Sequence, residues 1–504
     1  MSDSVEARRI PRLFTPAGVA AVTVLASIPA KVLSERLIDP DLWWHLKTGA
    51  IITSTHSIPH RDVFSYSVPG KAWVVQEWGA QVIFHWLRQA FGLYGIFFWR
   101  AVMLLAIYAL VARLLVRRMG SGIGTWVLLA LVAYAGASNW TERPNLFSFL
   151  LFVVTLGLVE RRDARAMWWF VPIAAVWANL HGMVILGIGL VALVAAAESL
   201  KAAFRWPGAD RAWAKTLWLV AGAGLIATFL NPRGPALLVH AFGLVRIVSS
   251  LVTEWASPSF HDLTGILFLA LLVITIAALA LNPERPDPTD VALALAFTVL
   301  ALQAARNLAI SAIVLGFVAA KWLPGALTSV RRSDPGVSSA RAAPSMVIGV
   351  VGLAVALGAL GAHVAREFPR SDDPAHIVDH EYPVASLQAI NKPGTRVFAL
   401  DFWAGYLIDQ SWPNVRVYQD TRVDMYGTEQ TRRYARAIAG LPGWQDTLDS
   451  SCTTHVLVRP RRDPLAEVLR TSPDWIIERE NIVAITFVRR APAPGCERFP
   501  IPNG

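Results

Sequence analysis

Two carboxylates, two indoles and an imidazole stand within seven residues, in the segment Asp39-Pro40-Asp41-Leu42-Trp43-Trp44-His45. This segment follows the first long apolar stretch, 17–37, where a membrane-spanning helix would end. A carboxylate at such a boundary is costly to desolvate, which indicates a function. Facing a cavity, Asp39 or Asp41 would accept a proton from a hydroxyl or an amine, or hold a divalent cation such as Mg²⁺ or Mn²⁺. The alternative is that one of them caps the helix that begins near Trp43.

Three arginines stand at the ends of later apolar stretches, each close in sequence to an asparagine: Arg143, Arg233 and Arg306. A planar guanidinium binds a phosphate through two parallel hydrogen bonds. We therefore expect these arginines to bind the phosphate of a donor molecule. The alternative is that they close the helix bundle as ion pairs, for instance Arg143 with Glu142 or Arg306 with Glu254.

Five further polar residues are predicted to line the same cavity, namely His45, Glu77, Asn179, His181 and Glu254. His45 lies one helical turn after Asp41, a spacing that favours a pair between them. His181 ends an apolar stretch, where an imidazole carries a proton, binds a ligand or caps the helix. Glu77 and Glu254 each precede a tryptophan, and an interfacial glutamate also occurs without any function.

The composition predicts the elements that position these residues. Of the 504 residues, 54% are hydrophobic and 16% are charged, and the mean hydropathy is +0.45. Soluble domains carry about 25% charged residues, so the chain is predicted to be a polytopic helical membrane protein. The excess of Lys and Arg, a net charge of +10, is then expected to set the orientation of the chain in the membrane. No basic and aromatic module for nucleic acid is visible, so no nucleic-acid partner is expected.

About eleven membrane spans are predicted, at residues 17–37, 94–116, 126–137, 146–159, 167–178, 183–200, 213–230, 263–281, 291–304, 308–320 and 346–365. Arginines 8, 9 and 12 predict a cytoplasmic segment 1–16, followed by a membrane module 17–366 with a first outer loop 38–92. Residues 43–53 and 77–91 of this loop are predicted to form short interfacial helices. Residues 236–252 predict a further amphipathic helix at the outer face.

Residues 367–504 have the composition of a soluble domain, predicted to lie outside the cytoplasm. The segments 396–400, 415–418, 455–458 and 482–488 favour strands, and 428–439 and 464–469 favour helices. This alternation predicts a small α/β domain. Its two cysteines, Cys452 and Cys496, either form a disulfide or remain two separate thiols.

Several motifs occur along nearly the whole chain: residues 39–46 (DPDLWWHL), 58–65 (IPHRDVFS), 76–78 (QEW), 177–182 (WANLHG), 231–234 (NPRG), and 402–407 (FWAGYL) through 419–422 (QDTR). Together they resemble a family of bacterial multi-span proteins that is grouped with the GT-C glycosyltransferases. Its neighbours are the dolichyl-phosphate-mannose mannosyltransferase-like and lipid A aminoarabinose transferase-like enzymes. The first outer loop here reads Asp-Pro-Asp where better-understood relatives commonly have Asp-Glu.

The resemblance implies a membrane glycosyltransferase. The donor would be a polyprenyl-phosphate-linked sugar, and the acceptor a lipid, glycan or protein at the outer face of a bacterial inner membrane. Asp39 or Asp41 would be the catalytic or metal-binding carboxylate, because both follow the first span. Two alternatives from other classes are a non-catalytic assembly protein of the cell envelope and a transporter of lipid-linked sugars. Convergence of the outer polar groups on one cavity would favour the enzyme.

Overall fold

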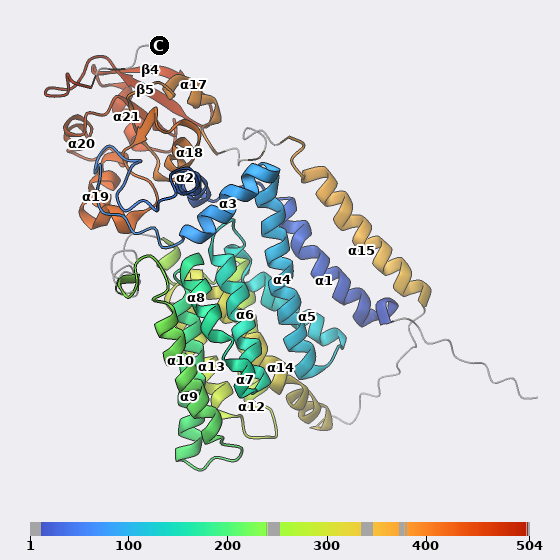
Figure 1. The fold of residues 1–504 in the computed structure, drawn as a ribbon. Coiled ribbons are helices and arrows are strands. Elements are labelled where there is room, and N and C mark those ends of the chain that lie inside the picture. Colours follow the sequence, from blue (N-terminus) through green and yellow to red (C-terminus); the bar gives the residue numbers. More distant parts are fainter. Residues whose placement is uncertain are drawn as a thin grey trace, which may run out of the picture.

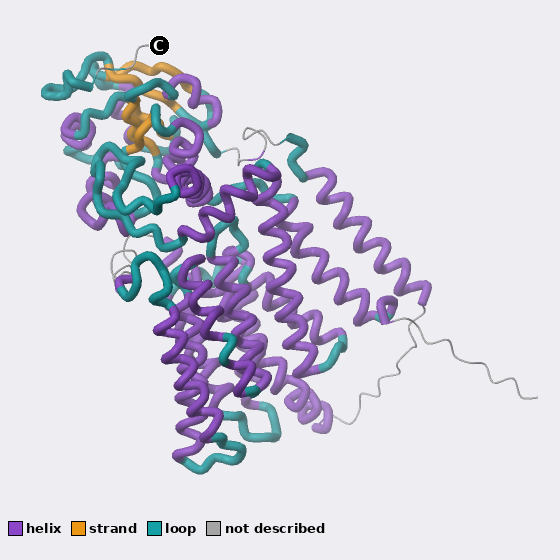
Figure 2. Tube along the Cα trace, viewed as in Figure 1, coloured by secondary structure: helices purple, strands orange, loops and turns teal. Residues whose placement is uncertain are grey.

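The computed structural model describes residues 12–237, 239, 253–333, 346–371, 377, 381–499 and 501. Long helices form a bundle, and a smaller domain that contains a sheet lies at one end of it (Figure 1, Figure 2). The predicted fold class, a polytopic helical protein with a small C-terminal α/β domain, is confirmed. The predicted segment 1–16 and the predicted helix 236–252 lie largely outside the described residues.

Each of the predicted apolar stretches contains a helix: α1 (Pro16–Leu33), α4 (Tyr94–Met119), α5 (Ile123–Ala135), α6 (Asn145–Arg161), α8 (Phe170–Leu180), α9 (Val184–Ala203), α10 (Arg211–Ala227), α12 (Leu263–Ala280), α13 (Pro288–Gln303), α14 (Leu308–Ser333) and α15 (Met346–Glu367). Within the described part of the chain, six of these are long and apolar enough to cross a membrane, namely α1, α4, α9, α12, α14 and α15. The chain is thus a multi-pass membrane protein, and the count of about eleven spans stays a prediction.

Short polar side chains fix where several of these helices begin. Thr15, Asp210, Asp262 and Asp287 each accept a backbone N–H from the first turn of the helix that follows, α1, α10, α12 and α13 respectively. These caps satisfy donors that the helix itself leaves without partners. Short segments between helices, including the 3₁₀ helices η3 (Thr253–Trp255) and η4 (Ala305–Asn307), carry candidate site residues.

The C-terminal domain is built on one mixed five-stranded sheet, with strand order β2-β1-β3-β5-β4. Its strands are β1 (Thr395–Ala399), β2 (Val415–Val417), β3 (His455–Val458), β4 (Trp475–Glu480) and β5 (Ile485–Arg489). β1 pairs in parallel with β2 and β3, and β5 pairs antiparallel with β3 and β4. The helices include α18 (Asp401–Ser411), α19 (Val423–Ile438), α20 (Trp444–Ser450) and α21 (Pro464–Arg470).

Four of the five strands and both predicted helices are confirmed, and β4 was not predicted. β4 lies at the edge of the sheet, and every residue after Trp475 is exposed. It therefore lacks the buried, alternating pattern that identifies a strand in a sequence. The two cysteines form a disulfide that joins residues 44 positions apart, which decides between the two alternatives.

The first outer loop is packed between the bundle and this domain. Its helices are α2 (Pro40–Thr55) and α3 (Trp78–Phe91), and α2 lies between α3 and α18 (Figure 1). Trp43 is fully buried and packs edge-on against Tyr406 of α18. The apolar side chains of α2 thus meet protein on both sides, and its position along the membrane interface stays a prediction.

The loop between α2 and α3 docks on the sheet. Tyr66 donates its backbone N–H to Val417 of β2, and Val417 donates its own to Phe64. Asp62 is buried and accepts a hydrogen bond of 2.9 Å from Arg422 of the C-terminal domain. The Arg422 guanidinium also bonds Asp420 and lies 4.3 Å from the ring centre of Trp73. This buried cluster fixes the domain on the loop.

Asp62→Asn is expected to loosen the docking of the C-terminal domain. The change weakens a buried charge-assisted contact, and breaking such a pair costs about 3–5 kcal/mol. Limited proteolysis of the purified protein should release the domain faster, and its melting temperature should fall. Glu429→Gln is the control, because Glu429 is 93% exposed in the same domain. Equal proteolysis rates for both variants would contradict this account.

Candidate active site

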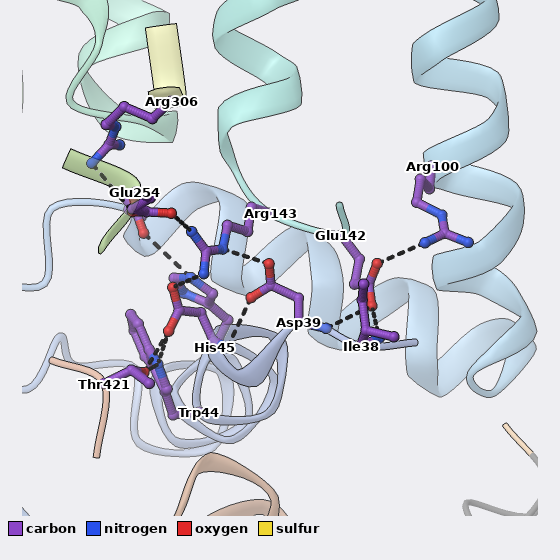
Figure 3. Close-up of polar contacts among 12 residues, drawn as sticks. Ile38, Asp39, Trp44, His45, Arg100, Glu142, Arg143, Glu254, Arg306 and Thr421 are labelled. Carbon is purple, nitrogen blue, oxygen red and sulfur yellow. Dashed lines mark hydrogen bonds and ion pairs between the residues drawn. The ribbon is translucent and has the colours of Figure 1, made fainter. Parts of the chain in front are cut away.

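A polar cavity of about 360 Å³ lies where the helix bundle, the first outer loop and the C-terminal domain meet. Among the predicted site residues, those that line it are Asp39, Asp41, His45, Glu77, Arg143, His181, Glu254 and Arg306. Figure 3 shows how several of these side chains point toward one another from different segments. Residues far apart in the sequence are thus brought to one place.

Asp39 begins α2, as the helix-cap alternative predicted. Its Oδ1 accepts the backbone N–H of Asp41 at 2.9 Å, and its Oδ2 lies 2.5 Å from Arg143 Nε (Figure 3). Pro40 occupies the first helical position, where its missing N–H costs nothing. Burial raises the pKa of Asp39 to about 6, opposed by Arg143 and reinforced by Asp41 and Glu142. Because its side chain is 2% exposed, Asp39 mainly holds the start of α2 and Arg143 in place.

Asp41 is the more accessible carboxylate, with its side chain 21% exposed. Its Oδ1 accepts hydrogen bonds from Thr421 Oγ1 and from Trp44 Nε1, and its Oδ2 lies 3.2 Å from Arg143 Nη2. Burial alone would raise the pKa of Asp41, but Arg143 and these donors hold it below its ordinary value. Asp41 is therefore a carboxylate with fixed orientation that faces the cavity.

Arg143 contacts three carboxylates at once. Besides Asp39 and Asp41, its Nη1 donates to Glu254 Oε2 at 2.7 Å. The other oxygen of Glu254 lies 3.5 Å from Arg306, whose guanidinium also stacks 4.5 Å from the ring centre of Trp255. The predicted pair of Arg306 with Glu254 is confirmed. Arg143 does not use Glu142, the partner that its sequence neighbourhood suggested.

Glu142 instead holds the start of α2 in place. Fully buried, it accepts the backbone N–H groups of Ile38 and Asp39 at 2.8 and 3.1 Å, and a hydrogen bond from Arg100 at 2.8 Å (Figure 3). Arg100 also bonds the carbonyls of Val32 and Glu35 at the end of α1. Arg100 was not among the residues expected at the site from the sequence, although an arginine inside the apolar stretch 94–116 is itself an indication of function.

Two predicted site residues are not brought to the cavity. Arg233 does not line the cavity. Its guanidinium donates a hydrogen bond to the backbone carbonyl of Trp73 at 2.5 Å. Asn179 accepts a hydrogen bond from Trp78 and donates to the carbonyls of Ala175 and Leu230. Both residues connect the first outer loop to the bundle, and neither faces the polar space.

A second group surrounds Glu77, the residue before α3. Glu77 Oε2 lies 3.4 Å from His45 Nε2, and Glu77 Oε1 lies 3.2 Å from His181 Nε2. The predicted pair of His45 with Asp41 is wrong, because the other ring nitrogen of His45 contacts Gln81 at 3.1 Å. Burial, with the nearby charge of Asp41, raises the pKa of Glu77 to about 8. Burial lowers the pKa of both histidines to about 3, so both are neutral.

The C-terminal domain closes the cavity with Thr421, Arg422 and Asp424. None of the three was a sequence-based candidate, although the motif 419–422 was noted as part of the resemblance. Thr421 hydrogen-bonds Asp41, so the soluble domain directly orients the more accessible carboxylate. The contribution of a segment 380 residues away could not be read from spacing.

The carboxylates do not fit a divalent cation. The Arg143 guanidinium already lies between Asp39, Asp41 and Glu254, the position that a cation would need. In addition, the described residues contain no cluster of three or more His, Cys, Asp or Glu side chains with the geometry of a metal site. Positive charge at these carboxylates is thus supplied by a side chain.

The arrangement of helices, first outer loop and C-terminal domain is similar to that of solved oligosaccharyltransferase structures. No protein-family model matches the sequence, and no curated protein sequence matches it. Among solved structures, the apo oligosaccharyltransferase of Archaeoglobus fulgidus is similar, with a TM-score of 0.57 and 12% identity over 89% of this chain and 70% of that one.

The oligosaccharyltransferase AglB from Archaeoglobus fulgidus, in complex with an inhibitory peptide and a dolichol-phosphate, gives a TM-score of 0.56 and 13% identity over 88% of this chain and 69% of that one. ArnT from Cupriavidus metallidurans, bound to undecaprenyl phosphate, gives a TM-score of 0.48 and 13% identity over 94% of this chain and 97% of that one. The two oligosaccharyltransferase structures confirm the predicted GT-C resemblance at the level of the fold.

Glu142→Gln is expected to destabilise the protein strongly. The variant leaves the buried Arg100 guanidinium without its counter-charge, which costs about 3–5 kcal/mol. Thermal unfolding in detergent should show a clearly lower melting temperature. Glu35→Gln is the matched control, because the Lys31–Glu35 pair is half-exposed and such pairs contribute about 0–1 kcal/mol. A melting temperature like that of the control would refute the role of Glu142.

Proposed function

We propose that the protein is a membrane glycosyltransferase that uses a polyprenyl-phosphate-linked sugar as donor. The observation that carries this proposal is the convergence of Asp41, Arg143, Glu254 and Arg306 on one polar cavity beside the membrane module. Such a site accommodates a charged head group while the lipid chain stays among the helices. The GT-C fold supports the proposal, and the archaeal neighbour was solved with a dolichol-phosphate.

The arginines would bind the donor phosphate. Arg306 is the better placed of the two, because among the described residues it has one ion-pair partner, Glu254 at 3.5 Å, whereas Arg143 contacts three carboxylates. A phosphate approaching Arg306 would compete with Glu254 for this guanidinium. A guanidinium suits this task because it forms bidentate bonds with phosphate oxygens. Arg233, which lies against Trp73, is left with a role in positioning the loop.

Asp41 would orient the acceptor. Its carboxylate is ionised and rigidly held by Thr421, Trp44 and Arg143, so it accepts a hydrogen bond from the acceptor hydroxyl or amine. This contact directs the lone pair of the acceptor atom at the anomeric carbon of the sugar, and positioning of this kind supplies a large part of enzymatic rate acceleration. The polyprenyl phosphate leaves with the electron pair of the broken bond.

The site would face the outer side of a bacterial inner membrane. The Cys452–Cys496 disulfide supports an extracytoplasmic C-terminal domain, because disulfides persist in oxidising compartments. Arginines at the opposite ends of the spans support a cytoplasmic N-terminus. The convergence of polar groups speaks against an assembly protein that would use the domain only as a contact surface. The acceptor is a lipid, a glycan or a protein.

The test is turnover of a radiolabelled polyprenyl-phosphate sugar by the purified protein in detergent. Asp41→Asn should lower kcat by at least about 100-fold, the scale of a lost polar catalytic contact, with a smaller fall in melting temperature than Asp39→Asn because Asp41 is the more exposed of the two. Asp39→Asn should lower both activity and melting temperature, because asparagine still caps α2 but no longer neutralises Arg143, which lies 2.5 Å from the buried Asp39 carboxylate. Full activity in Asp41→Asn would remove this residue from the mechanism. If the wild-type protein shows neither turnover nor binding of polyprenyl phosphate, the result favours the assembly-protein alternative.

Turnover is expected to persist after treatment with a chelator of divalent cations. Arg143 contacts Asp39, Asp41 and Glu254 and so already provides the positive charge that a bound metal ion would supply to them. The measurement compares kcat/KM before and after EDTA, with and without added Mg²⁺ or Mn²⁺. Loss of activity on chelation, with recovery on addition of either cation, would show that the side chains rearrange around a metal.

A further inference from the structure

The cavity contains a carboxyl group to which the proposed donor and acceptor contacts assign no role. Glu77 occupies the capping position of α3, yet its side chain makes no capping hydrogen bond. Its carboxyl group is 13% exposed, lines the cavity and faces one histidine on each side. A carboxyl group released from capping and enclosed by two neutral imidazoles needs an explanation.

The hydrogen bonds behind His181 fix which of its ring nitrogens carries the proton. Trp177 Nε1, which can only donate, bonds Ser148 Oγ at 2.7 Å. The Ser148 hydroxyl keeps its own hydrogen available for His181 Nδ1, 2.7 Å away, and a second contact of that nitrogen decides which atom donates. The backbone N–H of Met183 also points at this nitrogen, at 3.4 Å. His181 Nδ1 is thus an acceptor, and the proton of the neutral ring is on Nε2, facing Glu77.

His45 can carry its proton on either ring nitrogen, because its partner Gln81 can donate to or accept from Nδ1. Gln81 contacts His45 Nδ1 at 3.1 Å, and a primary amide can present either an N–H or a carbonyl oxygen. With the amide donating, His45 Nε2 carries the proton and donates toward an ionised Glu77. With the amide rotated, His45 Nε2 becomes an acceptor for a protonated Glu77. Glu77 can therefore gain and lose a proton while its neighbours stay hydrogen-bonded.

Asp41 is less suited to keep a proton. Both of its oxygens already have strong donors, namely Thr421 and Trp44 on one side and Arg143 on the other. Such bonds stabilise the ionised form, so a proton transferred to Asp41 would be lost again readily. The cavity therefore separates two tasks between two carboxyl groups, orientation at one and proton storage at the other.

We propose that Glu77 is the general base of the transfer, with His181 and His45 as positioning residues. This inference rests on the proposed glycosyltransferase function. The acceptor O–H or N–H bond breaks, and its electron pair forms the bond to the anomeric carbon. The bond from that carbon to the phosphate oxygen breaks, and its electron pair leaves with the polyprenyl phosphate. The proton goes to the Glu77 carboxylate.

The charge environment sets the pH range in which this base works. The titratable and charged groups around Glu77 come from several elements and comprise Asp41, His45, Arg143, His181, Arg306 and Asp424. Burial dominates and keeps the carboxyl group protonated below about pH 8. Because a base must be ionised to act, turnover should rise as the pH increases through this value.

The first experiment observes the proton directly and needs no turnover. Infrared difference spectra of the whole protein should show the carbonyl band of a protonated carboxylic acid at neutral pH, and this band should disappear as the pH is raised past about 8. Glu77→Gln should abolish this component, and the exposed control Glu429→Gln should retain it. A spectrum that is identical in wild type and Glu77→Gln would overturn the proposal.

The second experiment uses the polyprenyl-phosphate-sugar assay. Glu77→Gln should lower kcat by at least about 100-fold, with little change in donor binding, as expected for loss of a general base. His181→Phe removes the N–H that stabilises the ionised form, so the pH at half-maximal turnover should rise. His181→Gln, which keeps a donor, should show a smaller rise. An active wild type with unchanged turnover in Glu77→Gln would overturn this proposal alone, whereas an inactive wild type would count against the proposed function itself.

Discussion

The guanidinium of Arg143 is the interaction on which the rest of the site depends. It joins Asp39 at the start of the first outer loop, Asp41 one residue into α2, and Glu254 from η3, so three segments of chain meet at one charge. Carboxylates this close repel one another, and burial adds to the cost. A single delocalised cation with donors in a fixed fork offsets both effects. Removal of Arg143 would separate these segments and with them the walls of the cavity.

A second buried pair supports the first. Arg100 and Glu142 together bind the end of α1 and the first backbone N–H groups of the outer loop, so the chain leaves the membrane module in one fixed direction. The C-terminal domain then docks on the same loop through Arg422 and adds Thr421 to the cavity. A soluble domain and a membrane bundle thus share one site, which neither could form alone.

Much of this architecture was predictable from the sequence. The apolar stretches identified the long helices, because lipid requires continuous apolar segments, and the strand-rich runs identified most of the sheet. The segment around Asp39 and Asp41 stood out for the same reason, since carboxylates at a membrane boundary are unusual. Arg143, Glu254 and Arg306 were expected at the same side of the membrane and do meet in one cavity.

The partners within the site were not predictable to the same extent. His45 was expected to pair with Asp41 from helical spacing, but packing of α2 against α3 turns it to Glu77 and Gln81. Arg233 and Asn179 resembled site residues in their local sequence, yet tertiary packing directs them to backbone carbonyls. Spacing along the chain specifies neighbours within one helix, whereas these contacts depend on how separate helices pack.

A structure of the protein with a polyprenyl phosphate bound would show whether this cavity holds the donor. We expect the phosphate in the cavity, within hydrogen-bond distance of Arg306, with Glu254 displaced from that guanidinium and the lipid chain between the membrane helices. A phosphate bound elsewhere on the protein, with the Arg306–Glu254 contact intact, would contradict this expectation.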